Sequence, residues 1–310
     1  SIFKKKPMTE LANNPNAKMV ETQVFRPDLY EKETDGIVED EEGLLQLNIY
    51  NPGGVDPIVP DTPKLKQLLD MFLTLVKNLI PDDELREWTL DFLCVVFQQP
   101  GAKIRHAILI LSDAKQIGKS SLFKTIQKGL SKKNCSIISP RQAVAREKEF
   151  LTDKQFVLID ELLIDGDYKQ KISTLNVVRP LMSEEQHDAR PLFKTWRQIY
   201  STCNFFLFTN HKEAIAVEKN EERFTIIEAE KNRDEMGGDA FFKPYWEELK
   251  HGKLAHVVKH YLQTRPISNN FRIAGPCIKT EALEKMSEEG GHPMFPEVKT
   301  LLREGEEPFN

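Results

Sequence analysis

A glycine-lysine-serine tripeptide, Gly118-Lys119-Ser120, follows a short apolar run and constrains the fold of this chain more than any other feature. The apolar run, Ala107–Leu111 (AILIL), is continuous, as is typical of a strand buried on both faces of a parallel sheet. The residues from Lys119 to about Leu130 have helical spacing. Loops between a buried strand and a helix bind phosphate, because backbone N–H groups and the helix N-terminus attract anions. The sequence therefore predicts an α/β fold built around a phosphate-binding loop.

This loop departs from the usual pattern at one position. The pattern G-x-x-x-x-G-K-[ST] is matched at Gly118, Lys119 and Ser120, but Asp113 stands where the first glycine is expected. Because like charges repel, we expect the Asp113 carboxylate to point away from bound phosphates. Lys119 would contact the β- and γ-phosphates of ATP, and the Ser120 hydroxyl would bind Mg²⁺.

A pair of acids ends the next strongly apolar run, Phe156–Ile159 (FVLI). Asp160 and Glu161 then lie at the carboxyl end of a buried strand, which is the edge where open α/β sheets bind ligands. We expect Asp160 to hold Mg²⁺ through water and Glu161 to act as general base on the attacking water. The predicted contacts to ATP are thus Gln116, Ile117, Gly118, Lys119, Ser120, Ser121 and Asp160, and those to Mg²⁺ are Ser120 and Asp160.

Two further polar residues adjoin apolar runs. Asn210 follows the run Asn204–Phe208 (NFFLF) and would position water near the γ-phosphate. Arg223 precedes Phe224–Glu228 (FTIIE), and an arginine offered to a neighbouring subunit stabilises the charge of the transition state, which requires a ring or a dimer. The alternatives are a turn asparagine and a surface arginine paired with an adjacent glutamate.

The apolar pattern changes along the chain and divides it into four parts. The first part is poor in periodicity and rich in Pro, Gly and Asn, whereas helical spacing starts near residue 64. Pro81 interrupts that spacing, and Asp82 or Asp83 can cap a second helix. We expect an extended arm or linker over 1–62 with a short strand at Leu45–Tyr50, a helical subdomain over 63–101, the α/β core over 102–230, and a mainly helical region over 231–310 that includes a short helix at Glu281–Ser287.

Composition excludes several classes of protein. The chain has 310 residues, of which 40% are hydrophobic, but no apolar run approaches the roughly 18–20 residues that span a bilayer. The four cysteines are far apart, which argues against a zinc site or a disulfide framework. We therefore expect a cytoplasmic protein without a membrane partner. The net charge of −5 counts mildly against nucleic acid, although a ring can carry its basic residues only on the channel wall.

The order of the motifs resembles the superfamily 3 helicases, the AAA+ motors of small viruses and phages. The likeness is greatest to the helicase half of phage primase-helicases and primase-polymerases, one of them from a deep-sea vent phage, and it covers roughly residues 45–305. Leu47-Asn48-Ile49-Tyr50 with Pro52, and Gln99–Lys103, are similar to the segments that precede the motor in that group. The resemblance implies an AAA+ P-loop ATPase with a mostly parallel central sheet, an N-terminal helical subdomain and a C-terminal helical segment. It also implies a homo-oligomeric, hexameric ring on single-stranded DNA, and a primase or polymerase domain outside this chain.

Proteins of this group carry a β-hairpin that projects into the channel and touches DNA. The corresponding segment here, residues 187–198, holds three basic residues against one acid, with interleaved aromatic side chains. Basic residues with aromatic ones are what binding of single strands requires. The predicted DNA contacts are Arg190, Lys194, Trp196 and Arg197.

Two other functions fit the same nucleotide site. An AAA+ ATPase that loads or remodels a protein partner would lack the DNA hairpin function, so replacing Lys194 or Arg197 would not change its hydrolysis. A ring that only holds DNA would not need turnover, so Glu161→Gln would leave its biological output intact.

Overall fold

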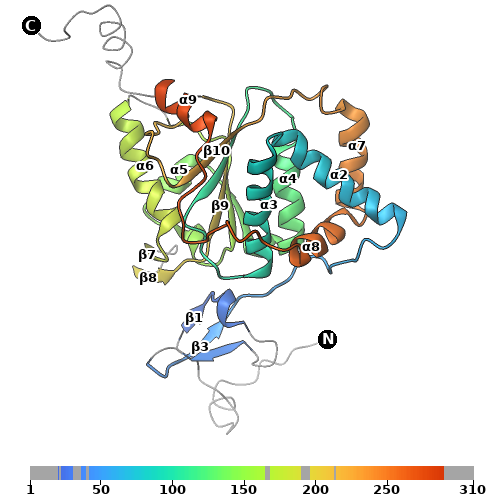
Figure 1. The fold of residues 1–310 in the computed structure, drawn as a ribbon. Coiled ribbons are helices and arrows are strands. Elements are labelled where there is room, and N and C mark those ends of the chain that lie inside the picture. Colours follow the sequence, from blue (N-terminus) through green and yellow to red (C-terminus); the bar gives the residue numbers. More distant parts are fainter. Residues whose placement is uncertain are drawn as a thin grey trace, which may run out of the picture.

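The computed structural model describes residues 20, 22–30, 36–39, 42–164, 168–189, 196–212 and 214–289. At its centre lies a five-stranded sheet in which every neighbouring pair is parallel (Figure 1). The strands are β4 (Ala107–Leu111), β5 (Cys135–Ile138), β6 (Phe156–Ile159), β9 (Asn204–Thr209) and β10 (Phe224–Glu228), in the order β10-β4-β9-β6-β5. The predicted mostly parallel α/β sheet is confirmed.

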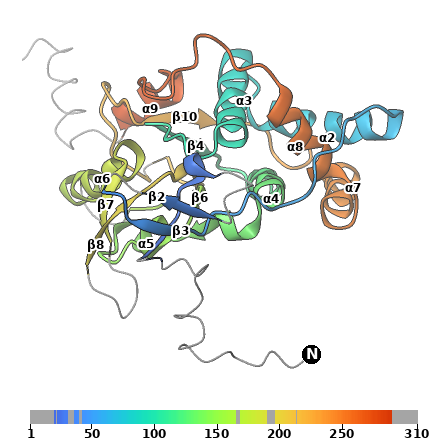
Figure 2. The same cartoon turned by 90° about the horizontal axis from the view of Figure 1, so that it is seen from below.

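Helices cover both faces of this sheet (Figures 1 and 2). Alternate side chains of β4 show why: Ile108 and Ile110 belong to one hydrophobic cluster, whereas Leu109 belongs to the other. The first cluster is completed by α2 (Pro63–Leu79), α3 (Asp83–Gln98), α4 (Lys119–Leu130), α7 (Gly238–Lys250) and α8 (Leu254–Thr264). The second is completed by α5 (Pro140–Val144), α6 (Tyr168–Ser183) and α9 (Glu281–Glu289).

Side-chain caps fix where several helices begin. The Thr62 hydroxyl accepts a hydrogen bond from the N–H of Leu65, the third residue of α2, at 3.3 Å, and Pro63 is the first helical residue. The Asp82 carboxylate accepts from Leu85 N at 2.8 Å, so Asp82 rather than its neighbour caps α3. The Thr280 hydroxyl accepts from the N–H of the third residue of α9 at 3.0 Å.

A second, smaller sheet lies near the start of the chain, where the sequence indicated only one strand. It has the order β1-β3-β2, from β1 (Thr22–Val24), β2 (Ile37–Glu39) and β3 (Leu45–Asn48). Strands β1 and β2 have three residues each, too few to show an alternating pattern. Both pair with β3, so a non-local ladder defines them. The described residues also form three short 3₁₀ turns, η1 (Pro27–Leu29), η2 (Lys132–Asn134) and η3 (Glu149–Leu151).

An antiparallel hairpin lies where the DNA-contacting segment was expected. Its strands are β7 (Gln186–Ala189) and β8 (Arg197–Tyr200). The predicted contacts Arg190 and Lys194 lie outside the described residues, and of Arg197 only the backbone is described. Among the helices that are described, none has the length and apolar character needed to cross a membrane.

Candidate active site

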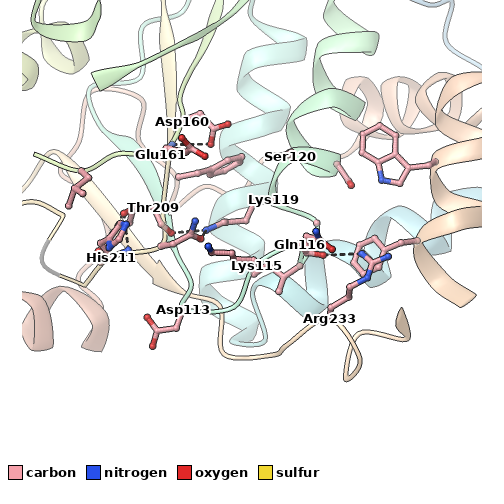
Figure 3. A pocket seen from close by; sticks show the side chains of 18 residues that line it. Asp113, Lys115, Gln116, Lys119, Ser120, Asp160, Glu161, Thr209, His211 and Arg233 are labelled. Atoms are coloured by element: carbon pink, nitrogen blue, oxygen red, sulfur yellow. Dashed lines mark hydrogen bonds between the residues drawn. The ribbon is translucent and has the colours of Figure 1, made fainter. Parts of the chain in front are cut away.

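The carboxyl ends of β4, β6 and β9 meet at one edge of the sheet, beside a cavity of about 810 Å³ (Figure 3). The phosphate-binding loop and the start of α4 supply one wall, Asp160 and Glu161 follow β6, and Asn210 follows β9. All predicted nucleotide contacts, which are Gln116, Ile117, Gly118, Lys119, Ser120, Ser121 and Asp160, line this cavity together with Glu161 and Asn210.

Gly118 occupies a position that accepts only glycine. Its φ of 100° lies in the left-handed region, and it is the residue directly before α4. A Cβ at this position would lie 2.6 Å from Leu75 Cδ1 of α2 and 2.9 Å from Phe242 Cε1 of α7. The end of the loop is therefore pressed against two helices, which fixes the start of α4 relative to the sheet.

Lys119 joins the loop to the end of β9. Its Nζ donates to the Thr209 carbonyl at 2.6 Å and to Asn210 Oδ1 at 2.7 Å. Burial lowers the pKa of the Lys119 ammonium to about 8, although the nearby Asp160 charge opposes that shift. A partly desolvated cation in this place attracts anions strongly.

The lowered pKa predicts that polyphosphate binding weakens in alkaline solution. Below its pKa Lys119 carries the positive charge, whereas above it the neutral amine must first take up a proton to bind the anion as an ammonium. The affinity for inorganic tripolyphosphate is expected to fall by up to about tenfold for each pH unit above about 8. Calorimetric titrations between about pH 7 and about pH 9.5 measure this fall.

Lys119→Arg is the matched variant, because a guanidinium keeps its charge throughout that range. The variant removes the contribution of Lys119 to the pH dependence of binding, so that only the titration of the ligand itself remains. An identical pH dependence in both proteins would show that Lys119 does not titrate at the site.

Asp160 and Glu161 lie on the same side of Lys119 but differ in burial (Figure 3). Asp160 is half-buried, and its Oδ1 accepts a hydrogen bond from the Glu161 backbone N–H at 3.0 Å. Glu161 is exposed and has a φ of 52°, an uncommon value for a residue with a Cβ. Backbone strain of this kind concentrates at functional sites. With the Ser120 hydroxyl, the Asp160 carboxylate offers the oxygen ligands that suit Mg²⁺.

Asp113, which departs from the usual loop pattern, lines the cavity, but its side chain points away from Lys119 (Figure 3). The Asp113 carboxylate is 70% exposed and lies 3.7 Å from Lys212 Nζ. Lys212 also lies 3.0 Å from Glu228, the last residue of β10. Lys212 therefore offsets only part of the negative charge of Asp113, because it is shared with Glu228.

Arg233, Phe242 and Trp246 also line the cavity, and the sequence did not single them out. Arg233 donates to the Gln116 carbonyl at 3.2 Å and to Asp239 at 2.7 Å, so it holds the phosphate loop from the side of α7. Phe242 and Trp246 have the spacing of one helical face, which is also the spacing of ordinary core residues. A local pattern therefore does not distinguish them from the core.

Arg223 is not among the described residues that line the cavity. It directly precedes β10, and its carbonyl accepts from the N–H of Ala107 at the start of β4. It therefore lies at the opposite edge of the parallel sheet from the cavity. Its Nη1 lies 4.0 Å from Glu222, which is the alternative surface pairing. The role of Arg223 in a neighbouring subunit stays a prediction.

Trp196 lies at a groove beside the hairpin. The groove has a volume of about 610 Å³, and its lining includes Arg146, Lys148 and Asp188. Trp196 is 41% exposed, and the Arg146 guanidinium lies 5.0 Å from its ring centroid. The sequence pointed to Trp196 but not to Arg146 or Lys148, which come from the loop after α5.

Comparison with known families identifies one match. A family model described as "Family of unknown function (DUF5906)" matches residues 110–223, a little over a third of the chain. The matched stretch runs from β4 to the residue before β10 and so includes the phosphate loop, the acid pair and Asn210. No curated protein matches the chain.

Solved structures share the fold over most of the chain. An apo structure of the C-terminal region of NrS-1 (305–718), a deep-sea vent phage primase-polymerase, has a TM-score of 0.72 and 18% identity. Two A-form apo structures of the same region have TM-scores of 0.71 and 0.68, at 17% and 16% identity. Each match covers 90% of this chain and 63% of the solved one, so this chain spans less than two thirds of its neighbour.

Proposed function

We propose that the chain is an ATP-hydrolysing AAA+ motor that moves along single-stranded DNA during phage or plasmid replication, as the helicase part of a primase-polymerase in the host cytoplasm. The observation that carries this proposal is the contact of Lys119 Nζ with Asn210 Oδ1 at 2.7 Å. This contact joins the phosphate loop, which follows β4, to the polar residue that follows β9. The cavity beside it also holds Asp160 and Glu161, and its 810 Å³ suits a nucleotide.

The residues of the cavity divide the chemistry among them. Lys119 would bind the β- and γ-phosphates, and Ser120 and Asp160 would hold Mg²⁺, which offsets the charge of the phosphates. Glu161 would accept a proton from the attacking water, while Asn210 would orient that water. The remaining loop residues, Gln116, Ile117, Gly118 and Ser121, would contribute contacts around the phosphates.

The DNA part of the proposal is supported by the groove at the hairpin. Trp196 exposes an aromatic face, and Arg146 and Lys148 supply positive charge beside it. This combination suits stacking on bases together with attraction of the phosphate backbone. The predicted contacts Arg190, Lys194 and Arg197 would extend the same surface. The shared fold with the C-terminal region of a phage primase-polymerase supports a role in replication.

The ring is supported by the separation of Arg223 from the cavity of its own chain. An arginine at the opposite edge of the sheet can serve a nucleotide only in another copy. Head-to-tail contacts of this kind close into rings when the rotation permits. We propose a hexamer, in which Arg223 stabilises the transition state of its neighbour.

The test is Mg²⁺-dependent ATP hydrolysis with and without a single-stranded oligonucleotide. We expect DNA to raise the rate several-fold in the wild type. The double variant Arg146→Ala, Trp196→Ala is expected to keep the DNA-free rate and to lose most of the stimulation.

Trp196→Phe is the matched control for stacking, because it retains an aromatic face and so retains the stimulation. Hydrolysis that ignores DNA in all three proteins would contradict a DNA motor and would favour the ATPase that remodels a protein partner. Absence of hydrolysis under every condition would contradict the proposed enzyme.

A further inference from the structure

Helix α7 lies along α4, on the side away from the sheet (Figures 1 and 2). Three contacts fix this arrangement. The Phe242 ring packs against Gly118, and the Tyr245 hydroxyl lies 2.8 Å from Thr125 Oγ1 of α4. One turn further along α4, Lys128 Nζ donates to the carbonyl of the last residue of α7 at 3.0 Å. The side chains of α7 are therefore held in place relative to the phosphate loop.

Trp246 of α7 lines the cavity, as Phe242 does, on the side of α4 away from the sheet. It follows the anchored Tyr245 and is half-buried, and it shares the cavity with Ser120 and Ser121. The Lys124 ammonium lies 4.9 Å from the centroid of the Trp246 indole. Lys124 itself is exposed.

The other large aromatic rings at the cavity are almost fully buried. Phe208 and Phe242 are 1% and 2% exposed. The Arg233 guanidinium lies 4.6 Å from the Phe242 ring, and Phe241 meets that ring edge-on at 5.2 Å. Of the described Phe and Trp side chains that line the cavity, Trp246 alone is more than marginally exposed.

The cavity thus has two chemically different ends. Lys119 reaches from α4 toward the end of β9, where Asn210 and the acids lie, whereas α7 lies on the other side of α4. A ligand whose phosphates contact Lys119 would extend its opposite end past Ser120 toward α7. The polar end suits a polyphosphate, and the indole suits a flat apolar ring.

We propose that Trp246 is the residue on which the nucleobase of the bound nucleotide stacks, an inference that rests on the proposed function. Stacking on an aromatic ring accepts any base, because every base has a π face. Trp246 therefore strengthens nucleotide binding without selecting adenine, and the affinities for ADP and GDP depend on it alike.

The experiment compares nucleoside diphosphates with an inorganic polyphosphate that has neither base nor sugar. ADP, GDP and inorganic tripolyphosphate are titrated calorimetrically into the wild type, Trp246→Ala and Trp246→Phe. We expect Trp246→Ala to weaken ADP and GDP binding by about 5- to 100-fold and to leave tripolyphosphate binding unchanged. Trp246→Phe retains most of the ADP affinity. Glu247→Ala, an exposed neighbour on α7, is the matched control and retains all of it.

A second measurement does not depend on the stability of the alanine variant. ADP is expected to quench tryptophan emission in the wild type but not in Trp246→Phe, and tripolyphosphate is expected to quench neither. Equal ADP affinity in Trp246→Ala and the wild type, or bound ADP that leaves the emission unchanged, overturns the stacking proposal and leaves the proposed function standing. A wild-type protein that binds neither ligand overturns the proposed function instead.

Discussion

Replacing Lys119 by alanine is expected to lower the rate of ATP hydrolysis at least about 100-fold. The loss of a single group that stabilises charge in the transition state has an effect of this size in other enzymes. Lys115 and Arg233 also line the cavity, but among the described residues it is the half-buried Lys119 ammonium that donates to the Asn210 side chain. Alanine also removes the charge that attracts the phosphates, and nucleotide binding is expected to weaken with hydrolysis. Phosphate release at saturating ATP and calorimetric titration of ADP measure the two effects separately.

The control for Lys119→Ala is the same change at an exposed lysine, Lys132→Ala, which keeps the wild-type rate. Circular dichroism on heating shows whether both variants remain folded. Lys119 donates two hydrogen bonds across to the end of β9, so a modest loss of stability is expected in its variant alone. A folded Lys119→Ala protein that hydrolyses ATP at the wild-type rate would contradict the assignment of this loop as the phosphate site.

The parts of the fold that could be predicted are those with a strong local signal. Strands β4, β6 and β10 begin and end as the apolar runs indicated, because each run is short, continuous and buried on both faces. Helix α4 likewise has the expected bounds, since Gly118 precedes it and its apolar spacing is regular. Asp82 gave the start of α3 for the same reason, as a cap is a local interaction.

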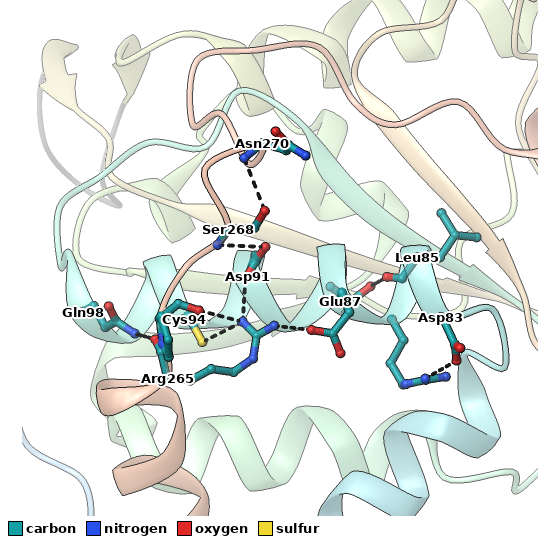
Figure 4. A network of polar contacts seen from close by, with 12 residues as sticks. Asp83, Leu85, Glu87, Asp91, Cys94, Gln98, Arg265, Ser268 and Asn270 are labelled. Carbon is teal, nitrogen blue, oxygen red and sulfur yellow. Dashed lines mark hydrogen bonds and ion pairs between the residues drawn. The ribbon is translucent and has the colours of Figure 1, made fainter.

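The parts that could not be predicted depend on distant partners. Strand β5 is at the edge of the sheet, where β6 is its one partner among the described strands, and Ile137 in it is 45% exposed, so its apolar pattern is weak. Helix α6 contains Pro180, which ordinarily indicates a helix end. Asp91 interrupts the apolar face of α3, and its carboxylate accepts from Arg265, 174 residues later, after α8 (Figure 4). Nothing near Asp91 in the sequence identifies Arg265 as the partner of this buried carboxylate.

The candidate site divides in the same way. Lys119, Asp160 and Asn210 could be expected to meet, because each follows or adjoins the carboxyl end of a strand in one parallel sheet. Arg233 and Trp246 come from a region that follows the sheet, and their proximity depends on how α7 packs on α4. Helical spacing alone gives core and cavity residues the same pattern.

Glu161→Gln is expected to separate nucleotide binding from hydrolysis. An amide has nearly the shape of a carboxylate but cannot accept a proton, so the rate of hydrolysis is expected to fall about 100-fold or more. The side chain is exposed, and both residues carry the Cβ that the φ of 52° must accommodate, so the fold is expected to persist. Lys119, Ser120 and Asp160 remain, so Mg-ATP is expected to bind as in the wild type. Calorimetry with ATP and single-turnover phosphate release test both statements.

This variant also distinguishes the functions that share the nucleotide site. A motor needs turnover, so Glu161→Gln would bind ATP and single-stranded DNA together, without moving, and would fail to support replication. A ring that only holds DNA for another domain needs ATP binding alone, so the same variant would support replication as well as the wild type. Normal hydrolysis in Glu161→Gln would contradict its role as general base. Because Asp160 precedes it and lies half-buried in the same cavity, Asp160→Asn would then be the variant that decides whether the neighbouring carboxylate accepts the proton.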